Sequence, residues 1–410
     1  FVLNKFLILQ PNWRNKYFFD YKLMKIKTLQ TFAALFSFVI LSTFSAFATE
    51  ENHSGKKEFN AGEMIMHHVL DAHEIHFITL GEGTPNDKHI SAPLPVILYS
   101  KEHGLDIFMS SAFHHTEVVE HSEDSTTAHA TIHGLVKHGP YGFYHEKIYF
   151  LNEAGTLDLD EHGHPTNAQP MDFSITKTVF GMLVASFLLV FLFMKASAGY
   201  KTRKNQAPKG LQSFLEPLVL FIRDEVAKPS IGHKYERFMP FLLTVFFFIL
   251  ICNLLGLIPF IGGFNITGNI AVTAILAIFT FIITSINGNK AYWLHILWPP
   301  GVPVWLYPLL IPIEIMGMFI KPLVLTLRLF ANITAGHIII LSFISLIFIF
   351  ASLFGTGAGL GASILSLAFG IFMNIMEFLV AFLQAYVFTL LSALYFGSAV
   401  EEHAHADDHH

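Results

Sequence analysis

The chain has a single cysteine, Cys252, among 410 residues, and only 14% of its residues are charged. One cysteine cannot form an intrachain disulfide, and its place in an apolar run is typical of a small buried hydrophobe. Lysines and arginines are scattered, without a cluster of interleaved aromatics, so nucleic-acid binding has no support. A Gly-rich phosphate-binding loop is also missing from the sequence, which leaves the chain without an energy source of its own.

Apolar residues are abundant instead: 53% of the chain is hydrophobic, and 43 residues are phenylalanine. A soluble domain would struggle to bury that much apolar surface, so the composition indicates lipid as the solvent. The surplus lies mainly after about residue 175, whereas most of the histidines precede it. We therefore predict two domains, a polar front and a membrane-embedded back.

The first 48 residues are predicted to be processing segments. Residues 1–23 start with Phe1 rather than methionine and show no sustained period, so we interpret them as a mis-called upstream extension. Residues 24–48 combine a basic start, a short apolar run and Ala-Phe-Ala at 46–48, a pattern typical of a secretory signal peptide. The alternative is a retained anchor, but the run is short for a membrane span.

Residues 49–173 lack a run long enough to span a bilayer, and we expect them to form a His-rich exported domain. Short alternating runs, such as Leu94–Tyr99 and Lys147–Leu151, are bounded by turn residues and predict a few strands.

Several histidines cluster in the stretch MHHVLDAHEIH, which contains His68, His73 and His76. Helical spacing would bring these three close together, as in a zinc or copper site. Because no cysteine accompanies them, scattered surface histidines are the preferred interpretation. We therefore expect no bound metal and no cofactor.

Three apolar segments are each long enough to cross a bilayer as a helix, and they comprise residues 175–194, 238–260 and 270–286. Basic residues follow the first segment and mark that end as cytoplasmic. Two longer segments, 309–350 and 360–400, follow, and a Gly-rich turn at 355–361 separates them.

Each of the two long segments would be on the order of 60 Å as a helix, twice the roughly 30 Å of hydrocarbon. Each must therefore break or tilt strongly, and Pro312 and Pro322 favour a break before Arg328. The predicted fold is an all-α polytopic membrane domain, 174–400, with about five transmembrane crossings. Its last two helices are expected to be long and tilted as a hairpin, after a small β-containing exported domain and before an acidic, His-ending cytoplasmic tail, 401–410.

Polar side chains interrupt the two long segments, although such groups are costly in lipid. An arginine or carboxylate at a helix centre costs about 2.5–3.5 kcal/mol, so these groups normally mark an ion pathway. The residues are Glu314, Lys321, Arg328, Asn332, His337, Asn374, Glu377 and Gln384. Lys321 can extend to the interface, whereas Arg328 has too many apolar residues on either side to do so.

Spacing predicts how these side chains meet. Arg328 and Asn332 share one helix face, as do Glu377 and Gln384. From Arg328 to His337 the rise is about 13.5 Å, and from Gln384 to Glu377 it is about 10.5 Å in the opposite chain direction. An antiparallel hairpin with Arg328 opposite Gln384 therefore sets His337 within about 3 Å of the height of Glu377.

The residue types predict the chemistry of this arrangement. A guanidinium stays protonated at any working pH, while imidazole and carboxylate exchange protons readily. Arg328 would block a cation moving straight through and would discharge a carboxylate brought against it by a neighbouring subunit. His337 and Glu377 would relay protons. The chain offers no such mobile carboxylate, so a partner is implied.

Three runs closely resemble subunit a of the F-type ATP synthase: Leu327–His337 (LRLFANITAGH), Leu383–Tyr395 (LQAYVFTLLSALY) and Asn253–Pro259 (NLLGLIP). The resemblance covers roughly residues 175–402. It implies a proton-conducting stator subunit whose last helices curve around a rotating ring of c subunits, with two offset half-channels that couple proton flow to ATP synthesis.

The same resemblance implies no catalytic activity of the chain on its own. Its further partners would be the peripheral stalk subunit b, the F1 sector and membrane lipid, without nucleic acid. The location would be the inner (plasma) membrane of a bacterium, with the N-terminal domain periplasmic and the C-terminus cytoplasmic.

Carried over residue by residue, Arg328 matches the family's essential arginine, Asn332 the asparagine one turn on, and Gln384 the glutamine beside that arginine. His337 and Glu377 match the two inlet positions, in the order of the mitochondrial-type proteins and opposite to that of some bacterial members.

Glu314 matches the acidic residue of the cytoplasmic outlet. The signal peptide and the long exported domain depart from the family's usual short N-terminus; tuning of proton supply, metal binding and contact with the stalk are open roles for them. H⁺ and Na⁺ are both open as the ion, because the binding carboxylate belongs to the ring.

Two alternatives fit less well. A stand-alone channel or secondary transporter would explain intramembrane charges, but inverted repeats would be expected, and the two long segments share length without a motif. A tethered interaction or metal-binding module would need a ligand cluster in 49–173 and would leave Arg328 unexplained.

Overall fold

The computed structural model describes residue 62 and residues 71–401, with gaps at 81–87, 114–134, 145, 154, 161–163, 203–208, 259–263 and 299–301. The predicted upstream extension, the signal peptide and the tail after Glu401 lie outside the described residues. Nearly everything described belongs to one compact unit, 58–78 and 89–410, and only Thr79, Leu80 and Lys88 belong to the other.

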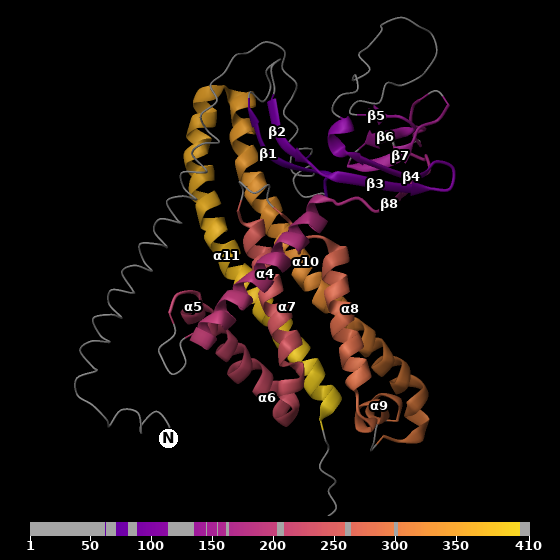
Figure 1. Ribbon diagram of the computed structural model, residues 1–410, viewed down its shortest axis with the longest axis vertical. Coiled ribbons are helices and arrows are strands. Elements are labelled where there is room, and N and C mark those ends of the chain that lie inside the picture. The colour runs from indigo at the N-terminus through magenta and orange to yellow at the C-terminus, as the bar shows by residue number, and fades with distance from the viewer. Residues whose placement is uncertain are drawn as a thin grey trace, which may run out of the picture. The chain divides into compact units, whose positions relative to one another are not determined.

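Short strands make up the described part before the first long helix (Figure 1). Their bounds are β1 Glu74–Leu80, β2 Lys88–Pro93, β3 Pro95–Ser100, β4 Gly104–Met109, β5 Val136–His138, β6 Tyr141–Tyr144, β7 Lys147–Phe150 and β8 Met171–Asp172. Two antiparallel sheets have the orders β4-β3-β8 and β5-β6-β7. Strand β3 overlaps the predicted segment 94–99 at residues 95–99, and β7 overlaps the predicted segment 147–151 at residues 147–150.

The alternation of side chains along β3 gives these sheets a common core. Val96 and Leu98 point to the same side of the strand and are fully buried. They pack with Phe113, Tyr141 and Ile148, so the two sheets share one apolar cluster. Tyr141 donates a hydrogen bond of 2.5 Å to the Asp106 carboxylate, and burial, together with this partner, raises the pKa of Tyr141 to about 12.

The helices that follow have these bounds: α4 Lys177–Thr202, α5 Leu211–Phe221, α6 Lys228–Ile231, α7 Tyr235–Gly256, α8 Ile270–Asn287, α9 Lys290–Leu297, α10 Tyr307–Phe354 and α11 Thr356–Val400. Within the described residues, five helical stretches are long and apolar enough to cross a membrane: 177–199, 211–256, 270–287, 307–354 and 357–400. The prediction of a polytopic helical membrane protein is confirmed.

The stretch 211–256 differs from the expectation, because the sequence predicts a span only from residue 238. Helix α5 leads through a π-helical turn, Ile222–Ala227, and α6 into α7. This turn contains three charged residues, Arg223, Asp224 and Lys228, which form ion pairs of 2.7–2.8 Å. Their charges lower the local hydropathy, so the sequence does not show one continuous apolar segment. The signal that would reveal α5 is the recurrence of apolar residues at helical spacing, as in Leu211 and Leu215.

Helix α10 is one uninterrupted helix of 48 residues, so the predicted break before Arg328 is wrong. Pro312 and Pro322 both lie inside it, and the Thr326 hydroxyl donates 2.9 Å to the carbonyl of Pro322, which satisfies part of the disturbed backbone. The expected turn at 355–361 is also shorter than predicted. Only Gly355, with φ 86°, leaves the helical conformation before α11 begins at Thr356.

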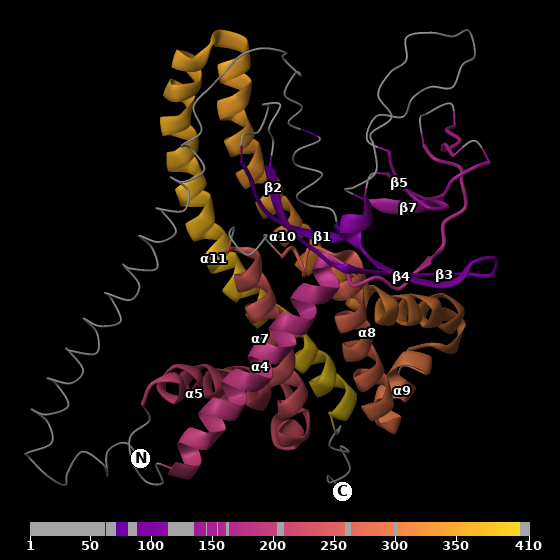
Figure 2. The same cartoon turned by 45° about the horizontal axis from the view of Figure 1, so that its top comes forward.

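Helices α10 and α11 pack side by side over much of their length (Figures 1 and 2). The lower part of α11 also packs against α7, where the rings of Phe238 and Phe396 stack with centroids 4.8 Å apart. Leu325 and Leu329 of α10 join this buried cluster. The core of the membrane domain therefore fixes α11 against both α7 and α10.

The closest approach in this core is between α11 and α6. A Cβ at Gly397 would collide with the backbone carbonyl oxygen of Ser230, whereas a Cβ at Gly370 of the same helix would meet nothing within 4 Å. We expect Gly397→Ala to destabilise the folded chain by about 1–3 kcal/mol or more, because backbone cannot move aside as a side chain can. Thermal stability of the detergent-purified protein measures this loss, with Gly370→Ala as the matched control. Equal stability of the two variants would contradict the close contact.

Candidate ion-translocating site

Arg328 lies on the face of α10 that this chain leaves exposed, while its sequence neighbour Leu329 is buried. The Gln384 side chain, buried in α11, approaches the backbone of this residue: its Nε2 lies 3.5 Å from the Arg328 carbonyl oxygen. Within the described part of the chain, no acidic side chain forms an ion pair with the Arg328 guanidinium. The arginine is therefore a permanent cation available to a group outside this chain.

Asn332 follows Arg328 by one turn and is exposed on the same face. The exposed residues around these two are mostly apolar, with Leu323, Val324 and Leu327 among them, and Lys321 lies two turns before Arg328. A cation within an apolar exposed face is costly in lipid, so this face needs protein or water beside it.

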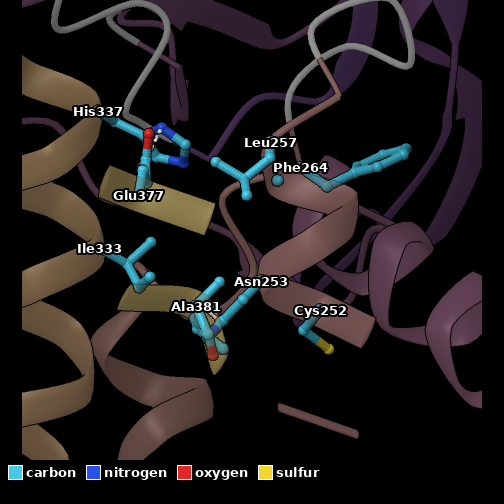
Figure 3. Close-up of a pocket in the computed structure, with 10 residues that line it drawn as sticks. Cys252, Asn253, Leu257, Phe264, Ile333, His337, Glu377 and Ala381 are labelled. Carbon is cyan, nitrogen blue, oxygen red and sulfur yellow. Dashed lines mark hydrogen bonds and ion pairs between the residues drawn. The ribbon is translucent and has the colours of Figure 1, made fainter. Parts of the chain in front are cut away.

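His337 and Glu377 form the second polar group of the membrane domain (Figure 3). His337 Nδ1 lies 3.2 Å from Glu377 Oε1, and the Glu377 side chain is only 5% exposed. Neither oxygen of this carboxylate has a hydrogen-bond partner among the described residues. A buried carboxylate without donors beside an imidazole is a group poised to take up a proton.

Glycines make room for this pair. A Cβ at Gly336 would lie 2.9 Å from Glu377 Oε1, and one at Gly256 would lie 3.6 Å from His337 Nε2. Larger side chains at these two positions would crowd the carboxylate and the imidazole.

A narrow internal pocket adjoins the His337–Glu377 pair, and Figure 3 shows the side chains around it. Its lining residues are Cys252, Asn253, Gly256, Leu257, Phe264, Thr267, Ile333, His337, Glu377 and Ala381. Asn253 bridges two elements here, because its amide donates 3.1 Å to the Ala381 carbonyl and accepts 2.6 Å from the Thr267 hydroxyl. Sequence reasoning used Asn253 only as part of a motif and assigned no role to Thr267.

The two contacts occur in the antiparallel register that the spacing predicts, with Gln384 at Arg328 and Glu377 at His337. Glu314 is not brought into either group. It is half-buried on α10, 14 residues before Arg328, or about 21 Å along the helix axis. Lys321 lies between Glu314 and Arg328 along α10, and its ammonium is 5.5 Å from the centre of the Tyr395 ring.

Among the described histidines of the exported part, His103 and His164 are exposed as predicted, but His73 is not. His73 is buried rather than on the surface, and the segment that follows it, Glu74–Leu80, is a strand, so helical spacing to His76 does not apply. His68 lies outside the described residues. In the part of the chain that the structure covers, no group of three or more His, Cys, Asp or Glu side chains is placed to hold a metal ion.

Five apolar helical stretches, a permanent cation on an apolar face and a buried His–Glu pair define a multi-pass membrane protein that moves ions. The family model described as ATP synthase A chain matches residues 179–397. The chain belongs to this family, the subunit a of F-type ATP synthases, and takes part in proton transport for ATP synthesis. A second model, described as Domain of unknown function (DUF8433), matches residues 64–173.

Curated relatives agree with this membership. The ATP synthase subunit a of Chloroherpeton thalassium is 47% identical over 245 residues, which cover 58% of this chain and 70% of the relative. That of Chlorobium phaeobacteroides (strain DSM 266) is 42% identical over 296 residues, covering 70% of this chain and 82% of the relative. ATP synthase subunit a 2 of Chlorobium luteolum is 41% identical over 321 residues, covering 76% and 89%.

Proposed function

We propose that this chain forms two offset half-channels beside a c-subunit ring and that Arg328 separates them. The observation that carries the proposal is the opposite placement of the two polar groups on α10. Arg328 is exposed, whereas His337, nine residues later and so rotated by half a turn around the helix axis, packs inward against Glu377 at 3.2 Å. A proton held by the buried pair therefore has no straight path past the arginine.

The inlet relay consists of His337 and Glu377. Imidazole and carboxyl groups both exchange protons readily, and both of these line the internal pocket, so a proton entering there can be held and passed on. The receiving group is a carboxylate on the ring, since the described residues offer no further carboxylate on this face of α10 next to Arg328.

Arg328 acts on the loaded ring from the other side. Its fixed charge favours the ionised form of a carboxylate brought against it, so the proton leaves the ring before that carboxylate passes the arginine. Gln384 holds the local backbone of α10, and Asn332 adds a neutral polar side chain one turn on. Glu314, on the same helix, serves the cytoplasmic outlet.

The topology belongs to the same proposal. The long helices α10 and α11 lie tilted as a hairpin around the ring, in a bacterial inner membrane. Residues 24–48 act as a signal peptide, 49–173 form a periplasmic domain with β structure, 174–400 span the membrane, and 401–410 are cytoplasmic. The peripheral stalk subunit b and lipid complete the surroundings.

The alternative of a stand-alone channel makes an opposite prediction about the partner. We expect liposomes containing the chain alone to show no proton flux under a potassium diffusion potential. Liposomes with the assembled membrane sector, ring included, should conduct protons, because a half-channel ends at a partner carboxylate. Acidification of a trapped pH dye measures the flux, and the same assay in sodium without a pH change tests for Na⁺. Flux through the chain alone would establish the channel.

A further inference from the structure

One face of the sheet β4-β3-β8 is apolar and exposed. Residues alternate between the two faces of each strand, and residues opposite one another in the register share a face. Val96 and Leu98 turn to the core that this sheet shares with β5-β6-β7, so the alternate residues turn outward. Six large outward side chains, each with 44–64% of its surface exposed, form what we call the apolar sheet face: Tyr99, Leu105, Ile107, Met109, Met171 and Phe173.

A face of this kind calls for a cover. Soluble monomers rarely expose large contiguous apolar patches, and such patches mark contacts with another protein or with a membrane. The described residues leave the outward face of the sheet open, whereas Tyr141 and Ile148 close its inward face. The place of the sheet relative to the membrane helices indicates which cover fits.

The sheet is joined to the first membrane helix by a hydrogen-bonded segment. Phe173 donates its backbone N–H to the Ile97 carbonyl at 2.9 Å, and Ile175 donates to the Pro95 carbonyl at 3.0 Å. Lys177, two residues further on, is the first residue of α4. The backbone therefore leaves strand β3 only where the helix begins, and the sheet is fixed at the end of a membrane span.

This end of the span lies near the membrane surface. The stretch 177–199 is about 35 Å long as a helix, close to the roughly 30 Å of hydrocarbon that it has to cross. Lys177 therefore lies near one boundary of the hydrocarbon. Phe173 precedes Lys177 by four residues, which reach at most about 14 Å, so the sheet begins at the level of the lipid headgroups or just outside it.

Exposed apolar surface occurs on both sides of this join. Leu183, Phe187 and Phe191 of α4 are exposed, and in a membrane span such side chains face lipid. The orientation of the sheet agrees with this continuity. In Figures 1 and 2, β5 and β7 lie on one side of β3 and β4, and α8 begins on the other side. The apolar sheet face is thus turned toward the membrane helices.

We propose that the apolar sheet face lies on the membrane surface beside α4 and that lipid covers it. Its side chains reach among the headgroups and the outermost acyl carbons, as the apolar side of an interfacial helix does. Tyr99 suits this position, because its ring is apolar and its hydroxyl can stay hydrated, as in the aromatic belts of membrane proteins. The inference requires only that α4 spans the membrane, so it is independent of the half-channels and of the side on which the strands lie.

Fluorescence quenching at single labelled positions in the complete complex tests this contact. Cys252 is buried and is the one cysteine of the chain, so Cys252→Ala gives a background for one new cysteine that carries a bimane label. Partner subunits without cysteine keep the label specific. Ile107→Cys places the label on the apolar sheet face, and Glu153→Cys, at an exposed position after β7, is the control. The complex is reconstituted in vesicles of phosphatidylcholine and phosphatidylglycerol.

We expect a lipid with a nitroxide on its headgroup to quench the label at Ile107→Cys roughly threefold to tenfold more than the label at Glu153→Cys. Iodide in the water should show the opposite order. Equal quenching by iodide at both positions would show a face open to water. Protection of Ile107→Cys from both quenchers would show that protein covers the face, and either result overturns the lipid contact.

Labels at Leu105→Cys and Met171→Cys extend the test to the other two strands of the sheet and replace Ile107→Cys if that variant does not assemble. Both positions are exposed, so a cysteine there disturbs little packing. The same order of quenching is expected at each. Lipid quenching confined to Met171→Cys, which lies nearest to α4 in the chain, would show that the sheet stands away from the membrane and would overturn the inference. None of these readouts depends on proton flux, so failure of the half-channel proposal would leave them unchanged.

Discussion

Arg328→Ala is expected to abolish ATP-driven proton pumping in membrane vesicles while the complex still assembles. The side chain lies on the exposed face of α10 and no described acidic group forms an ion pair with it, so its removal would delete the charge that discharges the ring in the proposed mechanism. A loss of about 2.7 kcal/mol of electrostatic stabilisation corresponds to about a 100-fold lower rate. Quenching of a pH-sensitive dye after ATP addition measures the pumping.

Lys321→Ala is the matched control, because Lys321 is a basic residue of the same helix two turns earlier and its ammonium lies over Tyr395 instead. Pumping should be retained in this variant. Pumping at wild-type coupling in Arg328→Ala would show that the central assignment is wrong, and the chain would then be a channel or a scaffold.

Changing either residue of the His337–Glu377 pair to the other's type should strongly lower proton flux, and changing both should restore it. We expect Glu377→His and His337→Glu to lose proton flux singly, by about 100-fold, because each leaves two like groups at a separation of 3.2 Å. The double variant, His337→Glu with Glu377→His, restores one imidazole and one carboxylate in the same place. Flux should therefore recover to within about tenfold of the wild-type rate.

Passive proton flux through the reconstituted membrane sector measures all four proteins under the same potential. Subunit content of each preparation, compared on a denaturing gel, separates loss of transport from loss of assembly. Additive losses in the double variant would mean that the two residues act independently, and the relay would have to be abandoned.

The site could be predicted from the sequence because helix geometry converts spacing into height and direction. Nine residues from Arg328 to His337 and seven from Glu377 to Gln384 fix the register of an antiparallel pair, and the structure shows both contacts of that register. The number of apolar stretches follows equally directly from hydropathy and length.

Other features of the fold depend on contacts between distant segments, which the spacing of residues in the sequence does not predict. Helix α10 continues through Pro312 and Pro322 although each proline removes a backbone hydrogen bond. Neighbouring groups must therefore bond to the disturbed backbone, as the Thr326 hydroxyl does at the Pro322 carbonyl. The burial of His73 depends on Asp172, which lies 99 positions later in the chain. The hydrogen bonds of Asn253 to Thr267 and Ala381 likewise join three separate segments.

The contact of Gly397 with the Ser230 carbonyl has a mechanical consequence. Two backbones meet at Gly397 and Ser230 without an intervening side chain, so this contact has no rotamer that could yield under load. In the proposed arrangement, with α10 and α11 beside a turning ring, this subunit would bear a sideways force on those two helices. A stiff contact would transmit this force from α11 to α6 and the helices around it, so that torque turns the ring and does not bend the membrane domain.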